Sequence, residues 1–234
     1  MKATPNRYDW SLPQERALFV RWIVALALAL QLLLTYPLWL TAGRSFPIVP
    51  VAPWVGALLS PADSLNFILL LAFVALIAVR PSALACIVVI AELVVLALQD
   101  LNRVQSWALY YLLMLAALAP SLRRSGHAWG AGRTIALLQG ITLAALFWNG
   151  AQKAQPDFFS RVVPAVTDAW GLPLPALRDP VSALITILPA LEVAGALALL
   201  FPVFRQVGVG VSVACSLATL LLCGPLGLSW QRPG

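Results

Sequence analysis

The amino-acid sequence predicts an all-α fold, a polytopic bundle of about seven transmembrane helices within a range of six to eight. Of its 234 residues, 61% are hydrophobic and 10% are charged, and the mean hydropathy is +0.89. A soluble domain usually carries about a quarter charged residues. The chain therefore has too little polar surface for a water-facing globule, which excludes a cytosolic enzyme, a disordered chain and a coiled coil.

Seven apolar runs approach the roughly 20 residues that a helix needs to cross the hydrocarbon core of a bilayer. They lie at residues 18–40, 62–79, 82–98, 104–120, 134–151, 181–201 and 206–223. The second to fourth runs are short, so tilt or local thinning of the bilayer has to accommodate them. A basic tail, residues 1–17, precedes the first run. Because no internal repeat is present, we expect one transmembrane domain over residues 1–234.

Two proline-rich segments, residues 41–61 and 152–180, interrupt the apolar pattern. Both hold aromatic and aliphatic residues among the prolines, which is not typical of a flexible linker. Irregular backbone is tolerated at membrane depth only where protein or a cavity covers it. We therefore expect packed caps or re-entrant segments on the extracytoplasmic side.

The distribution of basic residues predicts the orientation. With the N-terminus in the cytoplasm, nine Lys and Arg residues face the cytoplasm and six face the outside, and the loop over residues 121–133 is densely basic. We expect a multi-pass protein of the cell inner (plasma) membrane, with its C-terminus outside. The net charge of +6 then reflects the excess of Lys and Arg in cytoplasmic loops. We therefore expect membrane lipid as a partner, with a membrane protein or larger complex as a further possibility, and we do not expect nucleic acid. The cysteines show no metal-ligand spacing, and no metal site is expected.

A carboxylate, Glu192, falls near the middle of the sixth run, three residues after Pro189. Such a group costs about 2.5–3.5 kcal/mol to insert and usually faces the bundle interior or a wet cavity. Two interpretations stay open, a structural carboxyl that is protonated or paired with arginine, and a ligand-binding group. In both, Glu192 faces the protein interior.

A polar turn, residues 99–107, separates the third and fourth runs and holds Asp100, Asn102, Arg103 and Trp107. One interpretation is an exposed turn in which Asp100 or Asn102 caps the next helix and Trp107 anchors at the interface. The other is a ligand-binding role for these four residues.

A second polar group gathers where the fifth run ends, around Lys153. Asn149, Gln152 and Asp157 lie within about two turns of this lysine. Lys153 could snorkel to the interface and balance the helix dipole. Alternatively, it is a base, or a cation for an anionic head group, at the mouth of a cavity. Asp157 reaches Lys153 only if the helix continues past residue 155, and Pro156 favours a break.

Several motifs in matching order resemble the transmembrane core of the vitamin K-dependent γ-carboxylases, within the broader HTTM (horizontally transferred transmembrane) family. They are Asp100-Leu101-Asn102-Arg103 with Trp107, Arg123-Arg124-Ser125-Gly126-His127, Gly150-Ala151-Gln152-Lys153-Ala154-Gln155-Pro156-Asp157-Phe158, Leu191-Glu192-Val193-Ala194-Gly195 and Arg205-Gln206-Val207-Gly208. The likeness covers about residues 90–225. Small relatives of this kind also resemble DoxX- and MauE-like membrane proteins.

The resemblance implies that Lys153 corresponds to the base that activates a hydroquinone, with a quinone or hydroquinone as cofactor. The chain departs from the family at Ala214-Cys215-Ser216, where a histidine is common, and it ends at Gly234 without the soluble lumenal region. We therefore expect no peptide carboxylation. We expect a protein that binds a quinone- or lipid-like ligand near Lys153 in an accessory or redox-linked role. The alternatives are a quinol-dependent enzyme with Lys153 as general base, and a structural or assembly subunit of a larger membrane complex.

Overall fold

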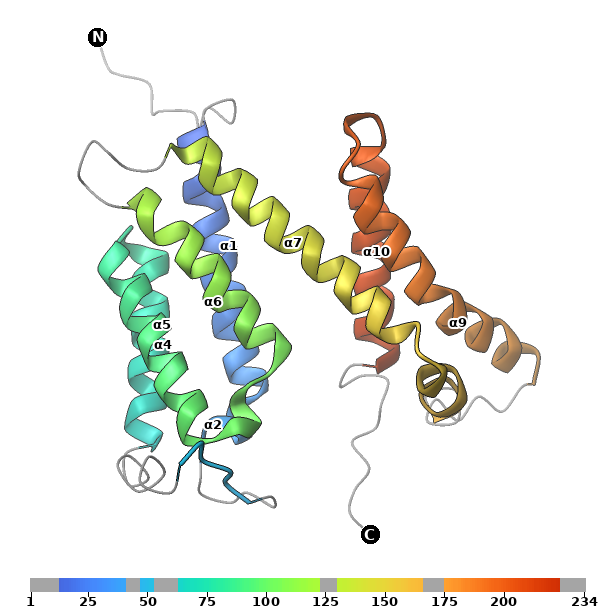
Figure 1. Cartoon of the computed structure of the whole chain (residues 1–234), viewed down its shortest axis with the longest axis horizontal. Coiled ribbons are helices and arrows are strands. Elements are labelled where there is room, and N and C mark those ends of the chain that lie inside the picture. The colour runs from blue at the N-terminus through green and yellow to red at the C-terminus, as the bar shows by residue number, and fades with distance from the viewer. Residues whose placement is uncertain (1–12, 41–46, 53–62, 123–129, 166–174, 224–234) are drawn as a thin grey trace, which may run out of the picture. The chain divides into compact units, whose positions relative to one another are not determined.

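The computed structural model describes residues 13–40, 47–52, 63–122, 130–165 and 175–223. Within these ranges every regular element is a helix and no strand occurs (Figure 1), so the all-α prediction is confirmed. The described chain divides into two compact units, Met1–Ile141 and Thr142–Gly234. From the sequence, one domain is expected. Because the boundary falls inside one continuous helix, α7 (Ala131–Lys153), neither a linker nor a change in composition marks it in the sequence.

The first unit is built on four helices that form a closed ring. Its elements are α1 (Pro13–Leu34), α2 (Tyr36–Trp39), α4 (Asp63–Val79), α5 (Ala83–Gln99), η2 (Leu101–Arg103), α6 (Ser106–Leu118), η3 (Ala119–Leu122) and the first half of α7. α1 contacts α4 and α6, and α5 contacts the same two helices. The short connection between α4 and α5 ends at Ser82, whose Oγ accepts a hydrogen bond from the backbone N–H of Ala85 at 3.2 Å and caps α5.

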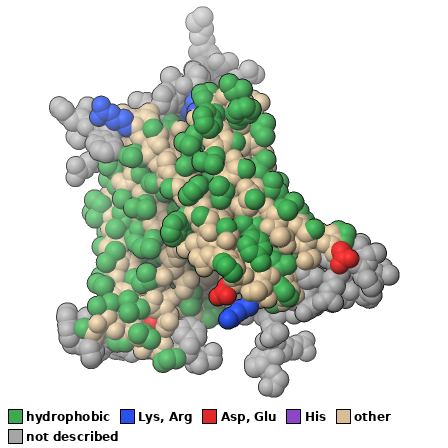
Figure 2. All heavy atoms as spheres, turned by 45° about the vertical axis from the view of Figure 1, so that its right-hand side comes forward, with side chains coloured by type: hydrophobic (Ala, Val, Ile, Leu, Met, Phe, Trp, Pro, Cys, Tyr) green, Lys and Arg blue, Asp and Glu red, His purple; other side chains and the backbone are tan. Residues whose placement is uncertain are grey.

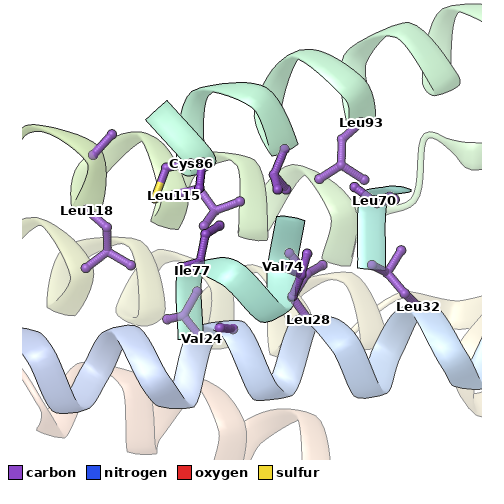
Figure 3. Packing of buried hydrophobic residues seen from close by; sticks show 14 of the residues in the cluster. Val24, Leu28, Leu32, Leu70, Val74, Ile77, Cys86, Leu93, Leu115 and Leu118 are labelled. Atoms are coloured by element: carbon purple, nitrogen blue, oxygen red, sulfur yellow. The ribbon is translucent and has the colours of Figure 1, made fainter. Parts of the chain in front are cut away.

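Apolar side chains from all four helices fill the centre of this ring (Figure 3). The labelled residues of the core are Val24, Leu28 and Leu32 of α1, Leu70, Val74 and Ile77 of α4, Cys86 and Leu93 of α5, and Leu115 and Leu118 of α6. The buried positions of α4 and α5 recur mostly every three or four residues, which places them on one face of each helix. The core therefore fixes which face of each helix points inward.

The first predicted run, residues 18–40, is not one helix, and this part of the prediction is wrong. α1 ends at Leu34, and the short helix α2 begins at Tyr36. Proline lacks an N–H, so Pro37 cannot continue the hydrogen-bond ladder of α1. The Thr35 hydroxyl donates to the carbonyl of Gln31 at 2.7 Å and accepts from Trp39 Nε1 at 3.1 Å, which holds the break in place.

The second unit holds the second half of α7 and the helices that follow it. These are η4 (Phe158–Val162), α9 (Pro175–Ala198), η5 (Pro202–Phe204) and α10 (Arg205–Cys223). α9 begins before the predicted run at 181 and includes Pro180 and Pro189. α10 packs closely on α9 because both contribute glycine. A Cβ on Gly208 would lie 2.9 Å from the Gly195 carbonyl oxygen and 2.9 Å from the Leu199 nitrogen.

Two described helices, Glu15–Leu34 and Ala131–Lys153, are long and apolar enough to cross a membrane. Four shorter apolar helices accompany them, at Asp63–Val79, Ala83–Gln99, Ser106–Leu122 and Ser182–Ala198. Figure 2 shows hydrophobic side chains spread over the described helices, with few charged ones among them. These features support an association with the membrane, while the count of seven spans and the orientation stay predictions.

Candidate functional site

An ion pair between Lys153 and Glu192 forms the centre of the candidate site in the second unit. Lys153 is the last residue of α7, and its Nζ lies 2.5 Å from Glu192 Oε1 in α9. The Glu192 side chain is 3% exposed and that of Lys153 is 17% exposed. The expectation that Glu192 faces the interior is confirmed, and its partner is a lysine rather than an arginine. The Lys153 ammonium therefore pairs with a buried carboxylate instead of only extending to the membrane interface.

Two further donors complete the surroundings of the Glu192 carboxylate. Asn149 Nδ2 donates to Oε2 at 3.1 Å, and the Thr219 hydroxyl donates to Oε1 at 3.2 Å. Lys153 Nζ also donates to Thr219 Oγ1 at 3.3 Å. Both carboxylate oxygens are therefore engaged, and donors from α7 and α10 converge on one residue of α9.

The pair combines a compensated buried carboxylate with a partly exposed ammonium. A buried carboxylate is costly unless a cation and hydrogen-bond donors compensate it, and Lys153, Asn149 and Thr219 supply both. Lysine at a helix C-terminus is also favoured by the helix dipole. The ammonium can only donate hydrogen bonds and the carboxylate can only accept them. A partly exposed donor beside a buried acceptor suits a ligand that offers both functions, such as a hydroxyl group.

The structure does not bring Asp157 and Gln152 into this cluster. α7 ends at Lys153, as Pro156 predicts, and Asp157 instead lies 3.8 Å from Arg161 in an ion pair whose side chains are 76% and 80% exposed. Gln152 is exposed to the outside of the unit. Asp157 could reach Lys153 only if the helix continued past residue 155, and α7 ends before that point, so the break that Pro156 favours keeps Asp157 out of the cluster.

The polar turn between the third and fourth runs belongs to the first unit and forms a separate buried cluster around Arg103. The Arg103 side chain is 1% exposed and lies 3.3 Å from Asp63 Oδ2. Its nitrogens donate to the carbonyls of Leu38 at 3.0 Å, Trp39 at 3.1 Å and Leu96 at 3.3 Å, and to Gln99 Oε1 at 3.3 Å. Arg103 thus joins the end of α2, the end of α5 and the start of α4.

The other members of this turn also have partners within the protein. Asp100 Oδ1 accepts from Asn102 N at 3.1 Å and Asn102 Nδ2 at 2.9 Å, and Asn102 Nδ2 donates to the carbonyl of Pro47 at 3.0 Å. The Trp107 ring meets that of Trp39 edge-on at 5.9 Å. The interpretation as an exposed turn is wrong for Asp100 and Arg103, which are buried, but Asp100 does cap the short helix η2 that follows it. Their geometry supports a structural role.

Sequence reasoning missed Thr219 in one cluster and Asp63 and Trp39 in the other, and it included Gln99 in the polar turn without naming it as a candidate. Asp63 is the first residue of an apolar helix, where a carboxylate is typical of a cap. Thr219 is a single hydroxyl in an apolar run. Its spacing is the feature that could have identified it. Small and polar residues, Gly208, Ser212, Cys215 and Thr219, recur at three- and four-residue intervals and so lie on one face of α10.

Comparison with known proteins identifies no relative: no family model matches the chain, and neither a curated protein nor a solved structure matches it. Among the described residues no group of three His, Cys, Asp or Glu side chains is placed to hold a metal ion.

Proposed function

We propose that this chain is a multi-pass protein of the cell inner membrane that binds a quinone- or lipid-like ligand at the Lys153–Glu192 pair, in an accessory or redox-linked role. The observation that carries the proposal is the pair itself. It joins a partly exposed cation to a buried carboxylate, whereas the other charged residues of α7, α9 and α10 all lie within the first five residues of their helices. Ionisable residues in such surroundings are costly, and they commonly mark a pathway or a ligand site.

The membrane assignment draws on the apolar helices and on the exposed side chains. Leu26, Val79 and Leu84 are 69%, 76% and 70% exposed on three different helices. They belong to a large set of exposed apolar side chains on the described helices, and extensive apolar surface of this kind commonly marks a membrane or protein contact. In this proposal the helices span about seven times, with the N-terminus in the cytoplasm and Lys153 on the extracytoplasmic side.

The ligand class follows from the donor and acceptor pattern together with the resemblance of residues 90–225 to the γ-carboxylase core. A quinol hydroxyl can donate to Glu192 while its oxygen accepts from Lys153, and a quinone carbonyl can accept from Lys153 alone. Binding is favoured over a base role for Lys153, because the ammonium is already held by Glu192 at 2.5 Å. A base would first have to leave that partner.

Quinone binding is tested with the purified protein in lipid nanodiscs and a short-chain benzoquinone as the probe, measured by quenching of tryptophan fluorescence. We expect Lys153→Ala to weaken binding at least tenfold and the exposed control Arg161→Ala to leave it unchanged. Lys153→Arg separates the two roles, because arginine keeps the cation but does not lose its proton at usable pH. Retained binding in Lys153→Arg indicates that residue 153 acts on the quinone as a cation. Unchanged binding in Lys153→Ala overturns the proposal.

The orientation is tested separately by cysteine labelling in a background without native cysteines. Asp157 and Arg80 are both exposed in the structure. A membrane-impermeant maleimide should label Asp157→Cys in intact cells and Arg80→Cys only after the membrane is opened. The reverse pattern contradicts the proposed orientation.

A further inference from the structure

Gly150 lies at a point where α7 and α9 approach unusually closely. A Cβ on Gly150 would lie 2.8 Å from the carbonyl oxygen of Pro189, 2.9 Å from Val193 Cγ2 and 3.0 Å from Glu192 Cβ. The first of these atoms belongs to the backbone and cannot rotate away. Gly132 and Gly140 of the same helix differ, since a Cβ on either would meet nothing within 4 Å.

The position of Gly150 in the sequence relates this close approach to the ion pair. Asn149 and Lys153 are four residues apart and therefore lie on one face of α7, with Gly150 beside them. The atoms that would clash with a Cβ include Glu192 itself and Pro189, which lies one turn earlier in α9. Any side chain at position 150 moves the two helices apart at the level where Lys153 and Asn149 reach Glu192.

We propose that Gly150 is a positioning residue for the Lys153–Glu192 pair: the missing side chain allows α7 to pack against α9 closely enough for Lys153 and Asn149 to hold the carboxylate. This inference rests on the proposed function only in taking the pair as the binding site. The geometry of the pair itself can be measured without any ligand.

The composition of the chain makes that measurement selective. Lys2 and Lys153 are the only lysines, and Glu15, Glu92 and Glu192 are the only glutamates. In a Lys2→Arg background, protein labelled with ¹⁵N-lysine and ¹³C-glutamate and held in nanodiscs therefore carries one labelled ammonium. Magic-angle-spinning NMR then detects the dipolar coupling between Lys153 Nζ and Glu192 Cδ.

We expect this coupling in the parent protein and in the matched control Gly140→Ala, and its loss in Gly150→Ala. A coupling that persists in Gly150→Ala overturns the inference. Should Gly150→Ala fail to fold, the same substitution is made together with Lys153→Met and Glu192→Gln, which remove the charges. Recovery of folding there supports a role through the pair, and continued failure shows that the glycine serves helix packing alone. If the protein does not bind quinone but the NMR coupling behaves as expected, the proposed function is refuted and the inference about Gly150 is not.

Discussion

Replacing Arg103 with alanine tests whether the buried cluster of the first unit holds its helices together. The substitution leaves Asp63, which is 5% exposed, without its guanidinium and removes the donor from the carbonyls of Leu38, Trp39 and Leu96. Breaking a buried ion pair by removing one partner costs about 3–5 kcal/mol, and each orphaned acceptor costs about 1–3 kcal/mol more when water cannot reach it. These terms overlap, because the figure for a broken ion pair already includes groups left without a partner, so we expect a total loss of about 4 kcal/mol.

The loss is measured by unfolding in mixed micelles with increasing SDS, followed by the reactivity of Cys86. This thiol is fully buried in the core of the first unit, so its labelling reports the opening of that unit. Cys215 and Cys223 are first replaced with alanine. A loss of about 4 kcal/mol corresponds to a roughly thousandfold increase in the open population.

A matched control and a double variant complete the test. Arg80 is exposed directly after α4 in the same unit, so Arg80→Ala should change stability by less than about 1 kcal/mol. Arg103→Met with Asp63→Leu removes both charges and should cost less than Arg103→Ala. If Arg103→Ala is as stable as Arg80→Ala, water reaches the cluster and Arg103 has no structural role.

Three further outcomes are expected. Glu192→Gln should lower the melting temperature in detergent more than Glu192→Gln combined with Lys153→Met, because only the single variant leaves an ammonium without its carboxylate; equal losses contradict the pair. Gly208→Ala should cost about 1–3 kcal/mol by overpacking, whereas Gly210→Ala, which meets open space, should change stability by less than about 1 kcal/mol; the same SDS titration compares them when it follows Cys215, which is buried in the second unit, with Cys86 and Cys223 replaced by alanine. Asp157→Asn should leave quinone affinity within about twofold, since its ion pair is exposed; a tenfold loss by fluorescence quenching would return Asp157 to the site.

Much of the helix arrangement could be predicted because apolar runs and their boundaries are local properties. The run at 82–98 corresponds to α5, and the run at 206–223 corresponds to α10. The first run fails at Thr35 because apolarity alone does not register that Pro37 removes a backbone donor. The boundary between the units was not predictable, since it falls within the uniform sequence of α7.

The sequence predicts the burial of Glu192 in one polar cluster but not the burial of Arg103 in the other. The cost of a carboxylate in an apolar helix places Glu192 in the interior without any structure. Its pairing with Lys153, 39 residues away, depends on tertiary packing at a glycine. Arg103 looks like a solvent-exposed turn residue, because no local pattern indicates that carbonyls from two distant helix ends converge on one guanidinium.

The convergence of three helices on Glu192 has a consequence for biosynthesis. If the helices enter the bilayer in chain order, Lys153 and Asn149 are in place before Glu192 is made, whereas Thr219 arrives only with α10. An isolated α9 would carry an uncompensated carboxylate into the bilayer, at a cost of about 2.5–3.5 kcal/mol. Pairing with the preceding helix removes most of that cost. In the proposed multi-pass topology, the translocon should therefore release α9 together with α7, and α10 should then add Thr219 to a carboxylate that already has its cation.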